Sequence, residues 1–144
     1  MMRTLVVGGT RGIGRAVART LAKEGHAVTV IGRREPARRL PKVRYQIADV
    51  LNRVRVGRQD NLVFCQRYRG EGDAWQGEFE TSLTATRDII EQCRGAKSIV
   101  IIASVAAHWV ASEQPVGYHT MNAGLVHMVR YLAVTLGPRG CRVN

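Results

Sequence analysis

Residues 4–25, T-L-V-V-G-G-T-R-G-I-G-R-A-V-A-R-T-L-A-K-E-G, decide the fold of this chain. The apolar run at 5–7 is too short for a helix and is typical of a strand that is buried on both faces. Glycines follow this run directly. After them Ile13, Val17 and Leu21 recur every four residues, which indicates a helix with one apolar face. The stretch therefore predicts a strand, a glycine turn and a helix.

The glycine turn predicts a dinucleotide site. Gly8, Gly12 and Gly14 let the backbone turn sharply, approach an anionic ligand and pack the helix on the strand. The first turn of the helix has unpaired N–H groups and the positive end of the helix dipole, where a pyrophosphate can bind. A turn that serves packing alone is the alternative. The strand before it and the helix after it favour the nucleotide site.

The rest of the chain continues to alternate strand and helix. Short apolar runs predict strands at 27–31, 43–47, 62–65 and 98–103, and apolar positions at helical spacing predict helices at 74–93 and 117–136. The connection between the third and fourth strands is shorter than a helical crossover usually needs. This order predicts an α/β fold, a Rossmann-like doubly wound parallel sheet with helices on both faces.

The positive charge of the chain needs an explanation. The formal charge is +11, from 22 Lys and Arg against 11 Asp and Glu, and ten arginines fall between Arg33 and Arg69. Such a surface can attract nucleic acid or an anionic membrane. No aromatic-interleaved or helix-turn-helix pattern accompanies the charge, so we favour a solvated basic face, with some arginines attracting a phosphorylated ligand. We expect no nucleic-acid partner.

The cysteines and histidines do not indicate a metal site or a disulfide framework. The three cysteines are widely separated, without C-x-x-C spacing, and the four histidines are scattered. The apolar runs are too short to span a bilayer, and the first residues do not resemble a signal peptide. We therefore expect a cytoplasmic protein without a membrane partner.

The end of the second strand favours NADP over NAD. At this point an acidic side chain would accept a hydrogen bond from the ribose 2′-hydroxyl of NAD, and this chain has Gly32, Arg33 and Arg34 instead. Together with Arg11 of the glycine turn, these arginines can pair with a 2′-phosphate. The alternative is that they only solvate a loop. Asp49, after the third strand, is placed to reach the adenine edge.

With these features, Ser104 and Tyr118, the chain resembles the short-chain dehydrogenase/reductase family. The family's first turn, T-G-x-x-x-G-I-G, is matched from Gly8 to Gly14, except that Gly9 occupies one neighbouring position, and the closing G-P-R-G-C-R-V-N resembles the start of its sixth strand. We therefore expect about six strands in the order 3-2-1-4-5-6. The predicted cofactor-binding residues are Gly8, Thr10, Arg11, Gly12, Ile13, Gly14, Arg33, Arg34, Asp49 and Val50.

The resemblance also implies the catalytic residues. The family has a serine after its fifth strand, matched by Ser104, and then Y-x-x-x-K, whose tyrosine is matched by Tyr118 and whose lysine is replaced by Asn122. In the family the tyrosine donates a proton to the substrate carbonyl and the serine orients that carbonyl. The resemblance thus implies an oxidoreductase that interconverts a small carbonyl compound and an alcohol by hydride transfer with NADP(H).

Departures from the family motifs support a second hypothesis. Besides Asn122, the chain has Phe64, Cys65, Gln66 and Arg67 where the family has N-N-A-G, and Ser82 where the family often has asparagine. Asn122 has no charge to favour the phenolate of a tyrosine. The alternative is an NADP-binding subunit with weak or no catalysis, which acts in regulation or interaction.

The length of the chain and its last predicted helix bear on domain organisation and assembly. We expect one dinucleotide-binding domain over 1–144 that lacks the family's C-terminal substrate segment. The predicted helix at 117–136 is apolar nearly all round, so that one face packs on the sheet and another is left for a partner. We expect a homo-oligomer through the helices at 74–93 and 117–136.

Overall fold

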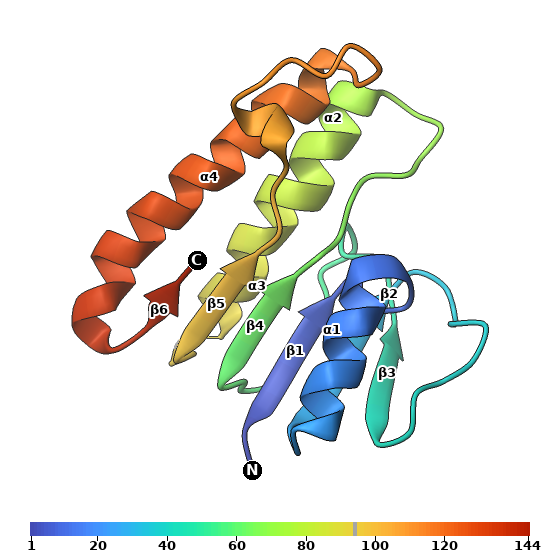
Figure 1. The fold of residues 1–144 in the computed structure, drawn as a ribbon, viewed down its shortest axis with the longest axis vertical. Coiled ribbons are helices and arrows are strands. Elements are labelled where there is room, and N and C mark those ends of the chain that lie inside the picture. Colours follow the sequence, from blue (N-terminus) through green and yellow to red (C-terminus); the bar gives the residue numbers. More distant parts are fainter. Residues whose placement is uncertain (94) are drawn as a thin grey trace.

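Six parallel strands form one sheet in the computed structural model, which describes residues 1–93 and 95–144 (Figure 1). Their order is β3-β2-β1-β4-β5-β6, so the predicted doubly wound arrangement is confirmed. The strands are β1 (Arg3–Val7), β2 (Ala27–Gly32), β3 (Val43–Ile47), β4 (Asn61–Phe64), β5 (Ser98–Ile101) and β6 (Arg142–Val143). The central strand β1 pairs with β2 and β4, and Leu5, Val6 and Val7 are fully buried.

Alternate residues of the strands point to two separate hydrophobic layers. On one face, Val6, Val30 and Val63 pack with Ala18 of α1 (Gly12–Lys23). On the other face, Leu5 and its neighbours pack with α3 (Ala85–Gln92) and α4 (Val116–Leu136). Helices therefore cover both faces, as predicted, with α1 on the opposite side from α3 and α4 (Figure 1).

The predicted continuous helix at 74–93 is interrupted. It consists of α2 (Ala74–Glu78), a π-helical segment η1 (Phe79–Thr84) and α3. The side chain of Gln66 donates to the Thr81 carbonyl (3.4 Å) and to Thr86 Oγ1 (2.8 Å). A side chain that takes a helix carbonyl disturbs the regular backbone ladder. Local spacing cannot predict this, because Gln66 belongs to another segment.

The connections and the last helix follow the sequence closely. No helix forms between β2 and β3 or between β3 and β4 in the described chain, which agrees with the short connections. Helix α4 ends at Leu136 and is followed by a 3₁₀ turn, η3 (Gly137–Arg139). Its outer side exposes Val116, Tyr131 and Val134. None of the described helices combines the length and apolar character needed to cross a membrane.

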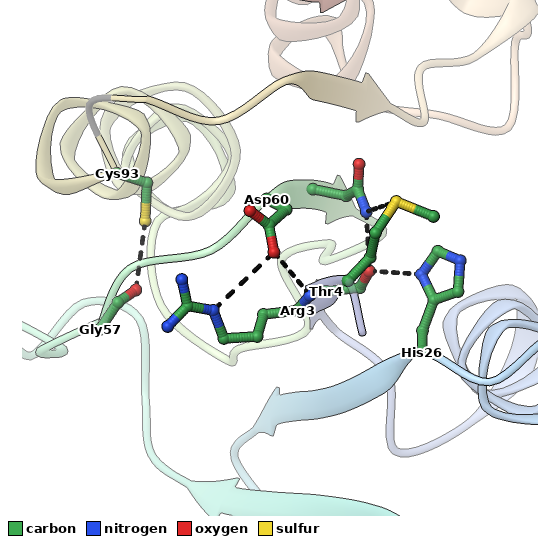
Figure 2. Close-up of polar contacts among 8 residues, drawn as sticks. Arg3, Thr4, His26, Gly57, Asp60 and Cys93 are labelled. Carbon is green, nitrogen blue, oxygen red and sulfur yellow. Dashed lines mark hydrogen bonds and ion pairs between the residues drawn. The ribbon is translucent and has the colours of Figure 1, made fainter.

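Polar contacts tie together the ends of the strands where β1, β2 and β4 begin (Figure 2). Asp60 accepts the backbone N–H of Arg3 (2.8 Å), and this hydrogen bond holds the pKa of the Asp60 carboxyl below its ordinary value. Thr4 Oγ1 lies 2.8 Å from His26 Nδ1, and the Cys93 thiol contacts the carbonyl of Gly57. His26 and Cys93 therefore have structural roles at the end of the sheet where the strands begin.

Candidate functional site

A cleft of about 870 Å³ lies at the carboxyl ends of the central strands, where the strand order reverses between β1 and β4. Ligands of doubly wound sheets bind at this point, in sites of roughly 300–1,000 Å³. All the predicted site residues except Ser104 line the cleft. Strand ends, the first turn of α1 and the first half of α4 therefore meet in one place, although they are far apart in the sequence.

The glycine turn has the geometry that the motif predicts. Gly8 has φ +77°, and a Cβ there would lie 2.6 Å from the backbone nitrogen of Gln66. A Cβ at Gly14 would collide with the carbonyl of Gly8. Gly12 has φ +54° with open space beside it. Gly8 and Gly14 thus allow β1, β4 and α1 to come together, and Gly12 opens the backbone toward the cleft.

The first turn of α1 fits a pyrophosphate. Its N-cap residue, Arg11, is extended and makes no side-chain capping bond, and the first turn has no acidic residue. The first N–H groups of a helix have no partner within the helix, and they lie here among cleft residues Gly12, Ile13 and Gly14. These donors, the helix dipole and the glycine backbone form an anion cradle, so the residues present fit a dinucleotide cofactor.

The adenosine end of the cleft is basic. Arg11, Arg33 and Arg34 line it and are exposed. A Cβ at Gly32 would lie 2.5 Å from the Thr10 side chain, so the last position of β2 has no room for an acidic side chain. The nearby carboxylate of Glu35 is paired with Arg39 (2.6 Å).

Asp49 and Val50 line the same end of the cleft after β3. Asp49 Oδ1 accepts the backbone N–H of Leu51 (3.0 Å), which holds the turn that follows the strand. The carboxylate thus orders its own loop at the edge of the predicted adenine site.

Tyr118 lies at the other end of the cleft under a guanidinium. The guanidinium carbon of Arg67 is 4.3 Å from the centroid of the Tyr118 ring, and Arg67 Nη2 donates to Gln114 Oε1 (2.6 Å). Asn122, one turn after Tyr118, is buried and donates its amide to the Tyr118 carbonyl (2.8 Å). In the sequence Arg67 stands out only as a bulky substitution and Gln114 has no signal, because their contact joins segments 47 positions apart.

Ser104 is the predicted residue that does not line the cleft. Its hydroxyl accepts the N–H of Ala106 (3.2 Å) and caps the 3₁₀ turn η2 (Val105–Ala107). A hydroxyl has two acceptor lone pairs and one O–H, so this cap leaves the O–H able to donate. Its neighbour Ala103 does line the cleft.

Buried polar groups surround the Tyr118 end. Ser82 lines the cleft from η1, and its buried hydroxyl has no hydrogen-bond partner among the described residues. Glu78 of α2 is also buried, and this burial raises the pKa of its carboxyl, while Arg67 and Arg69 lower it in part. π-helical segments are frequent at functional sites, and η1 brings Thr81 and Ser82 to this wall.

Cys65 lines the cleft but does not have the character of a nucleophile. Burial raises the pKa of its thiol to about 11, so the group is neutral at physiological pH. The thiolate is the reactive form of cysteine. No cluster of three or more His, Cys, Asp or Glu side chains among residues 1–93 and 95–144 has the arrangement of a metal site.

Two family models match the chain. One, described as short chain dehydrogenase, matches residues 3–54, and the other, described as Enoyl-(Acyl carrier protein) reductase, matches residues 71–144. The chain belongs to the short-chain dehydrogenase/reductase family. The first match contains the glycine turn and the second contains Tyr118, and the cleft residues at 65–69 lie between the two matches. No curated protein matches the chain.

Solved structures of this family share the fold. A short chain dehydrogenase from Leptospira borgpetersenii with bound NAD+ has a TM-score of 0.86 at 19% identity, over 99% of this chain and 68% of that one. Pseudomonas aeruginosa RhlG, in an NADP active-site complex, has a TM-score of 0.82 at 21% identity, over 99% and 69%. A short chain dehydrogenase/reductase family protein that is 28% identical has a TM-score of 0.84, over 99% and 72%.

Proposed function

We propose that this short-chain dehydrogenase/reductase is an NADP(H)-dependent oxidoreductase that interconverts a small carbonyl compound and an alcohol. The observation that supports this most directly is that one cleft collects the glycine cradle, the arginines after β2, and Tyr118. A titration of NADPH into the purified protein, followed by nicotinamide fluorescence, tests the binding. A panel of carbonyl compounds tests the reaction.

The mechanism assigns a proton role to Tyr118. When bound, the nicotinamide cofactor supplies the hydride that reaches the substrate carbon. Tyr118 Oη holds the proton that the substrate oxygen receives, so that a carbonyl becomes an alcohol and Tyr118 becomes a phenolate, which solvent protonates again. The O–H of Ser104 donates to the same substrate oxygen once the substrate reaches it. Buried Asn122 holds the Tyr118 turn of α4 through the Tyr118 carbonyl.

The preference for NADP rests on the arginines at the adenosine end. We expect the double substitution Arg33→Ala/Arg34→Ala to weaken NADPH binding by at least about tenfold, because a charge-assisted pair with the 2′-phosphate contributes about 1.5–3 kcal/mol. NADH lacks this phosphate, so its binding changes little. Fluorescence titration of both nucleotides measures the effect.

Arg38→Ala is the matched control for this prediction. Arg38 is an exposed arginine of the same segment that does not line the cleft. Its loss lowers the net charge without removing a predicted contact. If Arg38→Ala weakened NADPH binding as much as the double substitution does, or if NADH bound more tightly than NADPH to the unchanged protein, the NADP preference would be wrong.

A second function has a specific observation in its favour. The Asn122 amide donates to the Tyr118 carbonyl and carries no charge. The Arg67 guanidinium lies over the Tyr118 ring. These features suit a subunit that binds NADP, has weak or no catalysis, and acts in regulation or interaction. NADPH binding without turnover of any carbonyl compound would favour it.

A cytoplasmic location stays a prediction from the sequence.

We also propose a homo-oligomer that forms through the α2–α3 segment and α4. The outer side of α4 exposes the large side chains of Tyr131 and Val134 to solvent, and the exposure of apolar surface to water is unfavourable. Light scattering at micromolar concentration is expected to give at least a dimer, and Val134→Glu to raise its dissociation constant by about tenfold or more. Val110→Glu, an exposed valine outside the helices, is the control. A monomer under these conditions would contradict the proposal.

A further inference from the structure

The Tyr118 end of the cleft has a positive charge and no carboxylate. Arg67, from the loop after β4, lines the wall at this end and lies over the Tyr118 ring. The acidic side chains that line the cleft, among residues 1–93 and 95–144, are Glu35 and Asp49, and these follow β2 and β3 at the adenosine end. The place where the substrate reacts is therefore suited to a ligand with a negative charge.

The guanidinium of Arg67 has hydrogen-bond donors that the protein does not use. The side chain is half-buried, and a guanidinium has five N–H donors. Nη2 donates to Gln114 Oε1 at 2.6 Å, whereas Nε is buried without a partner among the described residues. A polar group that is removed from water without a compensating hydrogen bond is costly. Arg67 can therefore accommodate a further acceptor.

No ion pair neutralises Arg67 within the part of the chain that the structure describes. The ion pairs there involve Arg3, Arg39 and Arg87. Glu78 acts on Arg67 at longer range, but burial raises the pKa of the Glu78 carboxyl and so disfavours its ionised form. Gln114, which does contact the guanidinium, is a neutral amide. The charge of Arg67 is thus left for an anion from outside the protein.

A second polar group on the same wall also lacks a partner. Ser82 lines the cleft and is only 2% exposed, and its hydroxyl has no hydrogen bond to the described residues. Gln66 lines the cleft as well, and its Oε1 is buried and unpartnered while its amide nitrogen donates to Thr86 Oγ1. Buried polar groups in native proteins are nearly always hydrogen-bonded. These unused groups indicate a polar ligand at this wall.

From these observations, and resting on the proposed function, we infer that Arg67 determines substrate specificity by binding a carboxylate of the substrate. The planar guanidinium matches a carboxylate through two parallel N–H···O bonds. Its central carbon is 4.3 Å from the centroid of the ring whose hydroxyl holds the transferred proton. The carboxylate must then belong to a carbon close to the reacting carbonyl. The substrate class is a short 2-oxo or 3-oxo acid and the corresponding hydroxy acid.

The carboxylate takes no part in bond making in this scheme. The ketone carbon receives hydride from the nicotinamide and the ketone oxygen receives the proton of Tyr118, so that an oxo acid becomes a hydroxy acid and the carboxylate is unchanged. Arg67 holds the acid so that its ketone oxygen faces Tyr118 Oη. A neutral ketone of the same size lacks this contact and leaves the guanidinium unpaired.

The test compares each acid with its methyl ester, which has the same ketone without the charge. Steady-state kinetics at saturating NADPH give kcat/KM for 2-oxobutanoate, 3-oxobutanoate and the two esters. We expect at least one acid to exceed its ester by about tenfold or more, and Arg67→Gln to lower kcat/KM for that acid by about 10- to 100-fold, mainly through KM, because one charge-assisted pair is lost. The esters should change by no more than about twofold. Arg67→Lys should keep part of the preference, since lysine retains the charge without the planar fork.

Arg69→Gln is the matched control, because Arg69 is an exposed arginine of the same loop that also lines the cleft. It should leave the ratio of acid to ester within about twofold of its original value. Equal kcat/KM for acids and esters in the unchanged protein, the same ratio in Arg67→Gln, or an equal loss in Arg69→Gln would overturn the inference. Weaker NADPH binding in Arg67→Gln with an unchanged ratio would assign the guanidinium to a cofactor phosphate and would also overturn it.

A binding measurement separates this inference from the proposed function. Calorimetric titration of 2-oxobutanoate, 3-oxobutanoate and their methyl esters into the nucleotide-free protein needs no turnover. Binding of an acid that is lost in Arg67→Gln, without reduction of any carbonyl compound, would overturn the proposed function and leave the carboxylate site standing. Reduction of neutral carbonyl compounds with NADPH, without binding of or preference for either acid, would leave the proposed function standing and overturn the inference.

Discussion

Tyr118→Phe is expected to lower kcat for carbonyl reduction by about 10²- to 10⁴-fold and to leave NADPH binding within about twofold. The substitution removes the hydroxyl that holds the transferred proton, and general acid catalysis contributes an effect of this size. The ring itself, and its packing under Arg67, remain. Steady-state kinetics with NADPH and the best substrate of a carbonyl panel, together with a fluorescence titration of NADPH, measure both quantities.

Tyr131→Phe is the matched control, since Tyr131 is an exposed tyrosine of the same helix on the side away from the cleft. It should leave kcat unchanged. Equal turnover by Tyr118→Phe and the unchanged protein would remove Tyr118 from the mechanism. A loss of NADPH binding in Tyr118→Phe would show that the residue acts in binding rather than in proton transfer.

Gly8→Ala is expected to destabilise the protein by about 3 kcal/mol and to abolish measurable NADPH binding. Alanine at φ +77° is strained, and its Cβ would press on the backbone of Gln66, each effect having a cost of about 1–3 kcal/mol. The turn must open to relieve the contact, which moves the first turn of α1 away from the phosphate position. Urea denaturation measures the free energy of unfolding, and fluorescence measures the binding.

Alanine substitutions at two other glycines distinguish the effect of backbone strain from that of steric collision. Gly25 has φ +84° with open space around it, so Gly25→Ala should cost only about 1 kcal/mol. Gly57 also has open space and is not in the left-handed region, so Gly57→Ala should change the stability by no more than about 0.5 kcal/mol. If Gly8→Ala were no more destabilising than Gly25→Ala, the close approach to Gln66 would not matter.

Most of the fold was predictable because its signals are local. The strand at 43–47 was predicted at its observed bounds, and the strands predicted at 5–7, 27–31, 62–65 and 98–103 differ from the observed ones by one or two residues at one or both ends. Buried parallel strands have continuous apolar runs, and glycine marks the turns between elements. The continuous helix at 74–93 was wrong, because its π-helical segment contacts Gln66, a residue outside the helix.

The candidate site was predictable in its cofactor half and less so around Tyr118. The glycine turn is a local motif whose neighbours in sequence are its neighbours in space, and the structure places it in the cleft as expected. Around Tyr118 the family motif indicated the tyrosine itself and the absence of the usual lysine. It did not indicate that a guanidinium lies over the ring.

The strand, glycine turn and helix at 4–25 follow from sequence alone, since glycines and apolar spacing restrict the backbone within a few residues. The surroundings of Tyr118 depend on tertiary structure. Parallel pairing of β4 with β1 and β5 brings the loop that carries Arg67 to the start of α4, 47 positions from its partner Gln114. Charge acts through space rather than along the chain, so only the folded protein decides which cation faces the tyrosine.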